Sequence, residues 1–425
     1  MSAEDRPRLR PLEAYPIIER GQRMLALRDP SGLAPSVARL PPPSVAVVQL
    51  CDVEYTRDQI CAEFAKRYHR PLERSALDQL LQSLDDALLL DSERFRQHSA
   101  RIFSEFAKAS SRPAILAGRS YPSDPAELRA SLDQHFLPPN GPGAPGPATG
   151  ALPLALIAPH VDFARGGAAY AWAYKLLAEA SELPELVVIF GTDHIAGERP
   201  FTFTKKHFET PLGRFTTDEA LVDTIMAAVQ ERLGPTVAQG LFYDEHHHRG
   251  EHSLEFQMVW LRHVWGARAD QIKVLPILTG SFRHLIDDNR DPSTDSELTA
   301  ILEEITRAVA GRRTLFIAAA DLAHVGPRYG DPDPLDADDR QSLERRDHQS
   351  LQPVEKGDAS GWFAQIAVEK DRRNVCGLCP IYSMLAVAKP TSGRILAYGQ
   401  CPADDTGGSL VSIASLAFQG VSPGS

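Results

Sequence analysis

The chain has 425 residues, a net charge of −11 at pH 7 and five cysteines. This length allows two or three domains with a large core, and 43% hydrophobic residues with 24% charged residues is ordinary for a soluble globular protein. The negative charge argues against general nucleic-acid binding, and no apolar run is long enough to span a bilayer. The odd cysteine count indicates no disulfide framework, and the amino terminus does not read as a signal peptide. We therefore expect a cytoplasmic protein that binds neither nucleic acid nor membrane.

Residues 1–110 are expected to form a small helical domain. The stretch "RPLEAYPIIERGQRMLALRDP" has a polar, extended character with a few apolar anchors. Thr56 is a candidate N-cap, and Gln59 stands where a capping box requires it, so a helix is predicted to begin there. A second helix follows with leucines on one stripe, at Leu77, Leu80, Leu81, Leu84 and Leu88. Two such helices predict a helical or winged-helix-like unit.

The rest of the chain alternates between short apolar runs and helical patterns. The runs are "LALIAP", "LVVIFGT", "VLPILTG" and "TLFIAAA", and helical patterns such as "GGAAYAWAYKLLAEA" and "SLEFQMVWLRHVW" lie between them. Apolar strands that alternate with helices indicate an α/β domain whose sheet is at least partly parallel. Residues 138–150, "PPNGPGAPGPATG", are rich in proline and glycine and predict a flexible loop.

Polar side chains follow three of the four apolar runs at the point where each run ends. His160 follows the first run, His194 follows the second, and Asp321 follows the last, with His324 three residues on. Ligands of open α/β sheets bind beyond the carboxyl ends of the strands. A single histidine after a strand is more often structural, but three such events in one chain favour a shared site, provided that the strands are neighbours.

Cys376 and Cys379 form a Cys-x-x-Cys pair before a helix predicted to begin near Pro380, because proline suits the first helical turn. A helix amino terminus lowers the pKa of a thiol and makes it a better metal ligand. The spacing is also compatible with a zinc knuckle or a redox pair. A four-cysteine zinc site would need a second pair, which the sequence lacks.

The segment 244–255, "DEHHHRGEHSLE", is the most conspicuous histidine cluster of the chain. We interpret His246, His247 and His248 as part of a solvated loop. Glu251, His252 and Glu255 belong to the "EHSLE" portion and are expected to line the cleft or to orient its ligands. A helix predicted to begin at Ser253 would direct its positive end toward them.

Several short motifs occur in the order found in one protein family. "APHVDFARGG", "IFGTDHIAG", "EHSLEFQMVWL", "AAADLAHVG" and "VCGLCPIYSML" resemble the Memo family, whose bacterial members are called AmmeMemoRadiSam system protein B. The resemblance covers residues 113–420, so the proline- and glycine-rich loop lies within one domain. The preceding segments "VVQLCDVEYTRDQI" and "LLQSLDDALLLD" resemble the PqqD-like peptide-chaperone domains that accompany radical-SAM peptide modification.

The resemblance implies a fold like that of the class III extradiol dioxygenases, with a metal at the strand ends. It implies His160, His194 and Cys376 as metal ligands, with Asp321, His324 and His252 as catalytic residues. Iron(II) is the expected metal, and copper or zinc are alternatives. The chain departs from the family in two places. The family often has two adjacent histidines where this chain has His194 and Ile195, and Cys379 is unusual.

Two functions remain open from the sequence. The first is a non-haem iron or copper redox enzyme, in which Asp321 and His324 act as a base and its orienter or else fix the ligands. The second is a non-catalytic scaffold that holds a peptide or protein in the same cleft. A radical-SAM protein and an AMMECR1-like protein are the expected partners, and a peptide is the expected substrate. The sequence contains no Gly-x-Ser-x-Gly motif of the hydrolase type.

Overall fold

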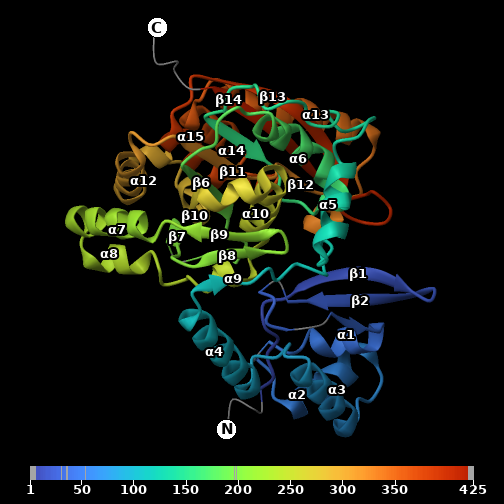
Figure 1. Cartoon of the computed structure of the whole chain (residues 1–425). Helices are drawn as coiled ribbons and strands as arrows, with labels where there is room; N and C mark the ends of the chain where they lie inside the picture. The colour runs from blue at the N-terminus through green and yellow to red at the C-terminus, as the bar shows by residue number, and fades with distance from the viewer. Residues whose placement is uncertain are drawn as a thin grey trace. The chain divides into compact units, whose positions relative to one another are not determined.

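The structure is a computed structural model that describes residues 6–29, 31–34, 37–52, 54–195, 197 and 199–419. It divides into two compact units, Met1–Lys108 and Ala109–Ser425 (Figure 1). Each unit has its own core and is described by itself. In the described part of the chain, no helix is long and apolar enough to cross a membrane.

The first unit combines a three-stranded antiparallel sheet with helices. Its elements are β1 (Glu13–Glu19), β2 (Gln22–Arg28), β3 (Ala38–Leu40), α1 (Pro42–Val48), α2 (Arg57–Tyr68), α3 (Arg74–Asp86) and α4 (Glu93–Lys108). The capping box predicted at Thr56 and Gln59 is present at the start of α2. Ile60 and Phe64 of α2 pack with the leucines of α3 in the core.

The sequence predicted helices for the first unit, and the structure contains a three-stranded sheet beside them. The polar, extended stretch forms the hairpin of β1 and β2, which turns at Arg20 and Gly21 with φ angles of 50° and 77°. Two consecutive positive φ angles suit a tight hairpin turn, because their twist matches that of the strands. Side chains of β1 are mostly exposed, so this strand carries none of the apolar alternation by which a half-buried strand is recognised.

The second unit is built on one mixed sheet with helices on both faces. Its strands are β4 (Ser111–Arg112), β5 (Ala155–Ala158), β6 (Leu186–Thr192), β7 (Phe201–Phe203), β8 (His207–Thr210), β9 (Gly213–Thr217), β10 (Lys273–Thr279), β11 (Thr314–Ala319), β12 (His324–Val325), β13 (Ser392–Pro402) and β14 (Leu410–Gln419). The order is β12-β14-β5-β11-β6-β10-β9-β8-β4, with β13 paired to β14 and β7 paired to β10. The central strands β5, β11, β6 and β10 are parallel, which confirms the predicted α/β class.

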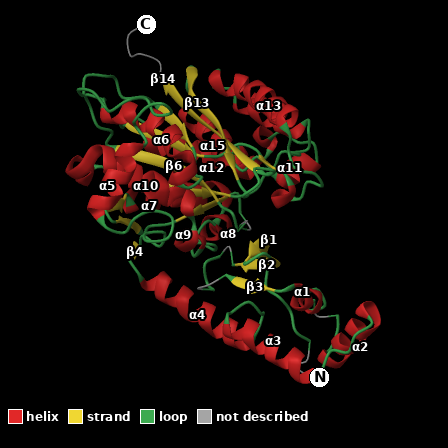
Figure 2. Cartoon of the chain, turned by 90° about the vertical axis from the view of Figure 1, so that its right-hand side faces the viewer, coloured by secondary structure: helices red, strands yellow, loops and turns green. Residues whose placement is uncertain are grey.

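Two helical layers cover this sheet (Figure 2). The helices are α5 (Pro125–Gln134), α6 (Phe163–Ala178), α7 (Glu219–Leu233), α8 (Pro235–Gly240), α9 (His247–Gly250), α10 (His252–Trp265), α11 (Arg283–Asp287), α12 (Ser296–Val309), α13 (Ala337–Glu355), α14 (Ala359–Ala367) and α15 (Leu378–Ala388). Apolar side chains of α5, α6 and α10 pack on one face of the sheet. Those of α7, α12, α14 and α15 pack on the other. Residues of β6 alternate between the two cores, as the period of a strand requires.

The strands that precede the predicted site residues are neighbours. β11 lies between β5 and β6 and is parallel to both, so the carboxyl ends of all three meet at one edge of the sheet. This arrangement satisfies the condition under which the sequence predicted a shared site. The loop 138–150 contains no helix or strand and is tied to α6, because Lys175 donates to the carbonyl oxygen of Pro142 over 3.0 Å and Gly150 donates to that of Glu179 over 2.8 Å.

Candidate metal centre

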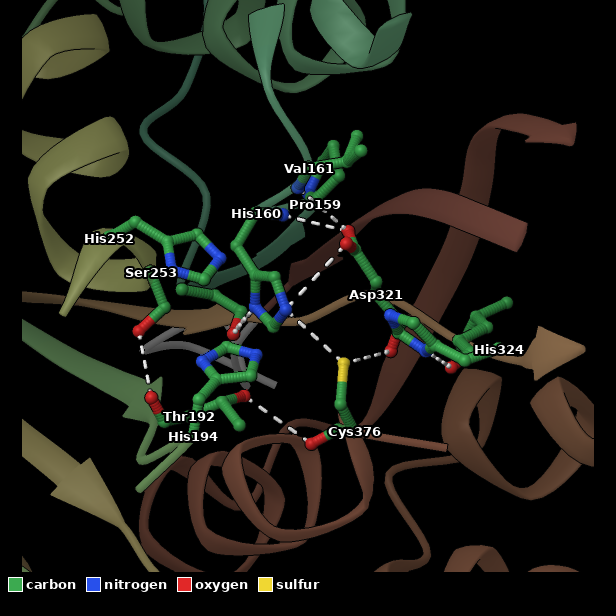
Figure 3. Close-up of polar contacts among 12 residues, drawn as sticks. Pro159, His160, Val161, Thr192, His194, His252, Ser253, Asp321, His324 and Cys376 are labelled. Atoms are coloured by element: carbon green, nitrogen blue, oxygen red, sulfur yellow. Dashed lines mark hydrogen bonds and ion pairs between the residues drawn. The ribbon is translucent and has the colours of Figure 1, made fainter. Parts of the chain in front are cut away.

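Three histidines from three different elements meet at this edge of the sheet. His160 follows β5, His194 follows β6, and His252 is the first residue of α10. One ring nitrogen of each lies within 4.8 Å of the corresponding nitrogens of the others. The ring centroids are 5.0 Å apart for His160 and His194, 5.4 Å for His160 and His252, and 4.6 Å for His194 and His252. Figure 3 shows the three rings gathered around one space.

Hydrogen bonds determine which nitrogen of each ring offers a lone pair. Nδ1 of His160 lies 2.9 Å from the carbonyl oxygen of Ala319, and a carbonyl can only accept, so Nδ1 carries the proton. Nδ1 of His194 and Nδ1 of His252 lie 3.1 Å and 3.2 Å from the carboxylate of Glu251. The same reasoning places a proton on each Nδ1. Nε2 is then the nitrogen of each ring that can bind a metal.

Glu251 is buried and serves as the common partner of two of the rings. Its carboxylate also accepts the backbone N–H of His194 over 3.2 Å and that of Ser253 over 2.8 Å. Burial raises its pKa, but the neighbouring imidazoles of His194 and His252 and these hydrogen bonds outweigh burial and hold the pKa well below its usual range. Burial alone would lower the pKa of His194, and the charge of Glu251 reverses this and raises it. A fixed carboxylate therefore sets the tautomer and orientation of two candidate ligands.

Cys376 precedes Gly377, the N-cap of α15, and brings its sulfur to the histidines. Its Sγ atom is 3.2 Å from Nε2 of His160 and 3.7 Å from the carbonyl oxygen of Asp321 (Figure 3). The backbone approaches closely here, since a Cβ atom on Gly377 would lie 2.3 Å from that same carbonyl oxygen. The prediction of a lowered thiol pKa is wrong. Burial, together with the charges of Asp321 and Glu251, raises the pKa of Cys376 well above its usual value, despite the nearby helix amino terminus.

Asp321 follows β11 and holds the segment that carries His160. Its Oδ1 atom accepts the backbone N–H groups of His160 and Val161 over 2.8 Å and 3.2 Å. Its Oδ2 atom lies 3.6 Å from Nε2 of His160. The lone pair of that nitrogen therefore faces a carboxylate oxygen and the sulfur of Cys376. The imidazole nitrogen, the carboxylate oxygen and the sulfur, once its thiol has lost its proton, can all donate electrons to a cation.

His324 begins β12 on the far side of Asp321 from the histidine cluster (Figure 3). Its Nδ1 atom lies 3.3 Å and 3.2 Å from the carbonyl oxygens of Leu322 and Asn374, so this nitrogen carries the proton. Burial lowers the pKa of His324 to about 4, which keeps the ring neutral near pH 7. The ring of Tyr329 packs edge-on against it at 5.1 Å, a neighbour that the sequence patterns did not indicate.

Other residues of the sequence predictions lie apart from the cluster. Glu255 was expected to line the cleft or to orient its ligands, but it is fully buried, where it forms an ion pair with Arg112 and accepts from the hydroxyl of Tyr121. Its carboxylate also accepts the N–H of Leu116. Cys379 packs in the apolar core, and burial raises its pKa. The ring of His194 is therefore oriented by Glu251 and not by Glu255.

The prediction that His246, His247 and His248 belong to a solvated loop is wrong. His247 and His248 are buried at the start of α9, and His246 is half-buried beside them. Nε2 of His248 lies 3.0 Å from the carbonyl oxygen of Thr202, and Nδ1 of His247 lies 2.8 Å from the carboxylate of Asp193. These partners come from residues far away in the sequence, so a local pattern of charged residues could not indicate the burial of the triplet.

The Memo-like protein family matches residues 112–417, which include every residue of the cluster. The chain belongs to the Memo-like family. A MEMO1 family protein of Aquifex aeolicus is 25% identical over 399 residues, which cover 92% of this chain and 95% of the relative. A MEMO1 family protein of Desulfurococcus amylolyticus is 27% identical over 315 residues, which cover 72% of this chain and 98% of the relative.

A third Memo relative, from Thermus thermophilus, is 28% identical over 344 residues, which cover 81% of this chain and 93% of the relative. The names of these three proteins state membership in the family and no activity. The Aquifex alignment is long enough to include most of the first unit as well as the Memo-like region. The comparisons therefore identify the family, and the chemistry of the site has to be argued from its residues.

Proposed function

We propose that this Memo-like protein is a non-haem metal-dependent redox enzyme, with iron(II) or copper held by His160, His194 and Cys376 and with His252 as a further ligand. The observation that carries the proposal is the shared orientation of the rings. Each Nδ1 faces a fixed acceptor, so Nε2 is the atom of each ring that can offer a lone pair to a cation. Sγ of Cys376 and a carboxylate oxygen of Asp321 also lie near Nε2 of His160, where both could contact a cation bound to that nitrogen.

The ligand types suit a metal of intermediate softness. Imidazole is a good ligand for iron, copper and zinc, and a thiolate shifts the preference toward copper(I), zinc or thiolate-ligated iron. When bound, iron or copper would supply one-electron chemistry with dioxygen or a bound substrate. The raised pKa of Cys376 means that its sulfur is a thiol until a metal displaces the proton. Metal binding is therefore expected to release a proton.

Asp321 and His324 would support this chemistry in different ways. Asp321 is engaged by two backbone N–H groups, which suits a residue that positions His160. His324 is a neutral imidazole with a protonated Nδ1, so its Nε2 atom can accept a proton from a substrate group that enters beside the metal. We assign the positioning role to Asp321 and the proton-transfer role to His324.

We also propose the finer membership that the sequence motifs imply, an AmmeMemoRadiSam system protein B with a PqqD-like first unit. A peptide would then be presented to the metal centre, with a radical-SAM protein and an AMMECR1-like protein as partners. The small sheet and four helices of the first unit support this assignment, since a sheet with an exposed edge strand can receive a peptide as an added strand.

The experiment is metal analysis and oxygen uptake on untagged protein loaded anaerobically with iron(II) or copper(I). The wild-type protein is expected to bind the metal and to consume oxygen when a reductant is supplied. The His324→Ala variant should keep its metal and lose about 10²–10⁴-fold in rate if the ring transfers a proton. A loss of metal affinity of about 10–100-fold would instead mean that His324 orients ligands.

One result would favour the scaffold function over the enzyme. The His160→Ala/His194→Ala variant removes two ligands and is expected to lose both metal and oxygen uptake. If metal-free wild-type protein binds a candidate substrate peptide as tightly as the loaded protein, and loading produces no oxygen uptake, the proposed redox activity is wrong. The cleft would then act as a binding surface.

A further inference from the structure

A second group of metal-ligating side chains lies beside the first, in the histidine triplet that the Memo motifs do not include. Asp244, His246 and His247 each offer one ligand atom, and these atoms lie within 4.8 Å of one another. Asp244 and His247 are buried, with exposed fractions of 8% and 6%, and His246 is half-buried. Burial matters here, because exposed acidic groups are common without a metal.

A carboxylate from the sheet holds one of these rings in place. Asp193, which follows β6, places its Oδ2 atom 2.8 Å from Nδ1 of His247. This nitrogen is the donor in that contact, so Nε2 of His247 offers its lone pair to a ligand. A carboxylate that fixes an imidazole in this way is the usual outer partner of a metal-binding histidine.

The two carboxylates also converge. A Cβ atom on Gly197 would lie 2.9 Å from Oδ2 of Asp244 and 3.2 Å from Oδ2 of Asp193. Both aspartates are at least nine-tenths buried. Two carboxylate oxygens and two imidazoles therefore lie around one space, which gives a mixed oxygen and nitrogen donor set. Such a donor set suits a divalent transition-metal ion at the point where the side chains meet.

We propose that Asp244, His246 and His247 bind a second divalent transition-metal ion, with Asp193 as the residue that positions His247. Two imidazoles and one carboxylate with an open position form a ligand set suited to zinc or another borderline divalent ion. The set has no thiolate, so it differs in chemistry from the centre that contains Cys376. The inference does not depend on the redox function proposed for that centre.

The fold connects the two centres through the same two segments. Asp193 contacts the second group, while His194, the next residue, belongs to the first. In the same way His247 belongs to the second group, and Glu251 and His252, which follow after one turn of helix, belong to the first. One pairing of the end of β6 with segment 244–252 therefore builds both sites.

The test measures zinc per chain in untagged, full-length protein that has been stripped with a chelator and reloaded with Zn²⁺. A His160→Gln/His194→Gln variant disables the first centre and is expected to retain one zinc ion per chain. Adding Asp244→Asn and His246→Gln is expected to remove that ion. The matched control is His284→Gln/Asp288→Asn in the same background, which changes an exposed histidine and an exposed aspartate near α11 and should retain the zinc.

Two further measurements guard against loss of folding. Thermal unfolding of the His160→Gln/His194→Gln protein should shift upward when Zn²⁺ is added. The Asp193→Asn substitution leaves all three proposed ligands in place and is expected to weaken this zinc site by about 10–100-fold. The proposal is overturned if folded His160→Gln/His194→Gln protein binds no zinc. It is equally overturned if, in the His160→Gln/His194→Gln background, the added Asp193→Asn and the added His246→Gln substitutions each leave the zinc affinity unchanged.

Discussion

Glu251 joins His194 and His252 through one buried carboxylate, which lies 3.1 Å from Nδ1 of the first ring and 3.2 Å from Nδ1 of the second. His194 follows a strand and His252 begins a helix, so this single side chain aligns ligands from two parts of the fold. The backbone N–H groups of His194 and Ser253 hold the carboxylate in turn. The geometry of the candidate metal centre therefore depends on a residue that does not itself face the metal.

Replacing Glu251 by glutamine tests this dependence. The amide keeps the shape of the side chain but loses the charge, and it can no longer accept hydrogen bonds through both atoms. Metal affinity is expected to fall by about 10–100-fold, measured by anaerobic competition with a chromophoric chelator. Glu231→Gln, at an exposed position of α7, is the control. An affinity equal to that of the wild type would show that Glu251 does not orient the ligands.

The buried ion pair of Arg112 and Glu255 stabilises the segment that carries the site. Both side chains are fully buried, and Arg112 also donates to the carbonyl oxygens of His248 and Glu251 over 2.7 Å and 2.8 Å. Arg112→Met leaves a buried carboxylate without its cation, so the free energy of unfolding should fall by about 3–5 kcal/mol in denaturant titrations.

Two variants serve as controls for that measurement. Arg119→Met, at an exposed position nearby, should change stability little. The double variant Arg112→Met/Glu255→Met should lose less than the sum of the two single losses, because it leaves no unpaired charge. Equal losses for Arg112→Met and Arg119→Met would contradict the stabilising role of the pair.

Gly377 is required by the close approach of two backbone segments. A Cβ atom at this position would lie 2.3 Å from the carbonyl oxygen of Asp321, which also accepts the backbone N–H of Gly377 over 3.0 Å. Gly377→Ala should therefore displace Cys376 and abolish the sulfur-to-metal charge-transfer absorption of the cobalt(II)-loaded protein. Gly399→Ala is the control, since a Cβ atom there would make ordinary contacts of 3.6 Å with Ile413. Retention of the band in Gly377→Ala would mean that Cys376 does not depend on the close approach at Gly377.

The buried ring of His248 predicts acid sensitivity in metal-free protein. Burial lowers its pKa to about 4, whereas an unfolded chain takes up the proton near pH 6.5. The unfolded state therefore binds more protons between these values. The contribution of His248 to the free energy of unfolding is therefore fully present above pH 6.5. It falls by about 3 kcal/mol as the pH decreases toward 4. His324, whose pKa burial also lowers to about 4, acts in the same direction.

Denaturant titrations across this pH range measure the effect. His248→Gln retains an amide donor for the carbonyl oxygen of Thr202 but cannot titrate, so its stability should depend less steeply on pH. His284→Gln, at an exposed position, should behave like the wild type. Identical pH dependence in His248→Gln and in the wild type would contradict the prediction.

The sequence predicted the parts of the structure that follow from local periodicity. The apolar runs became β5, β6, β10 and β11, and the polar residues after them meet at one edge because those strands are parallel neighbours. The capping box of Thr56 and Gln59 could also be predicted from the sequence, since these two residues are three positions apart. These features are set by nearby residues, and a single sequence contains the information.

The burial of side chains and their long-range partners could not be predicted from local sequence patterns. His247 and His248 look like a solvated charged run, but Asp193 and Thr202 provide their partners from a distant strand and loop. The sequence predicted that the helix amino terminus lowers the pKa of the Cys376 thiol, yet burial beside two carboxylates raises this pKa. Both corrections depend on which chain segments the fold brings together, and periodicity does not determine that.

X-ray absorption spectroscopy at the metal edge of the iron(II)-loaded or copper(I)-loaded protein tests whether Cys376 and the histidines bind one metal ion. The proposed ligand set predicts a sulfur scatterer at about 2.3 Å together with imidazole nitrogens at about 2.0–2.1 Å, by analogy with zinc sites. In the Cys376→Ser variant the sulfur signal should disappear while imidazole scattering remains. A wild-type spectrum with no sulfur scatterer, or one that Cys376→Ser leaves unchanged, would contradict the proposed ligand set.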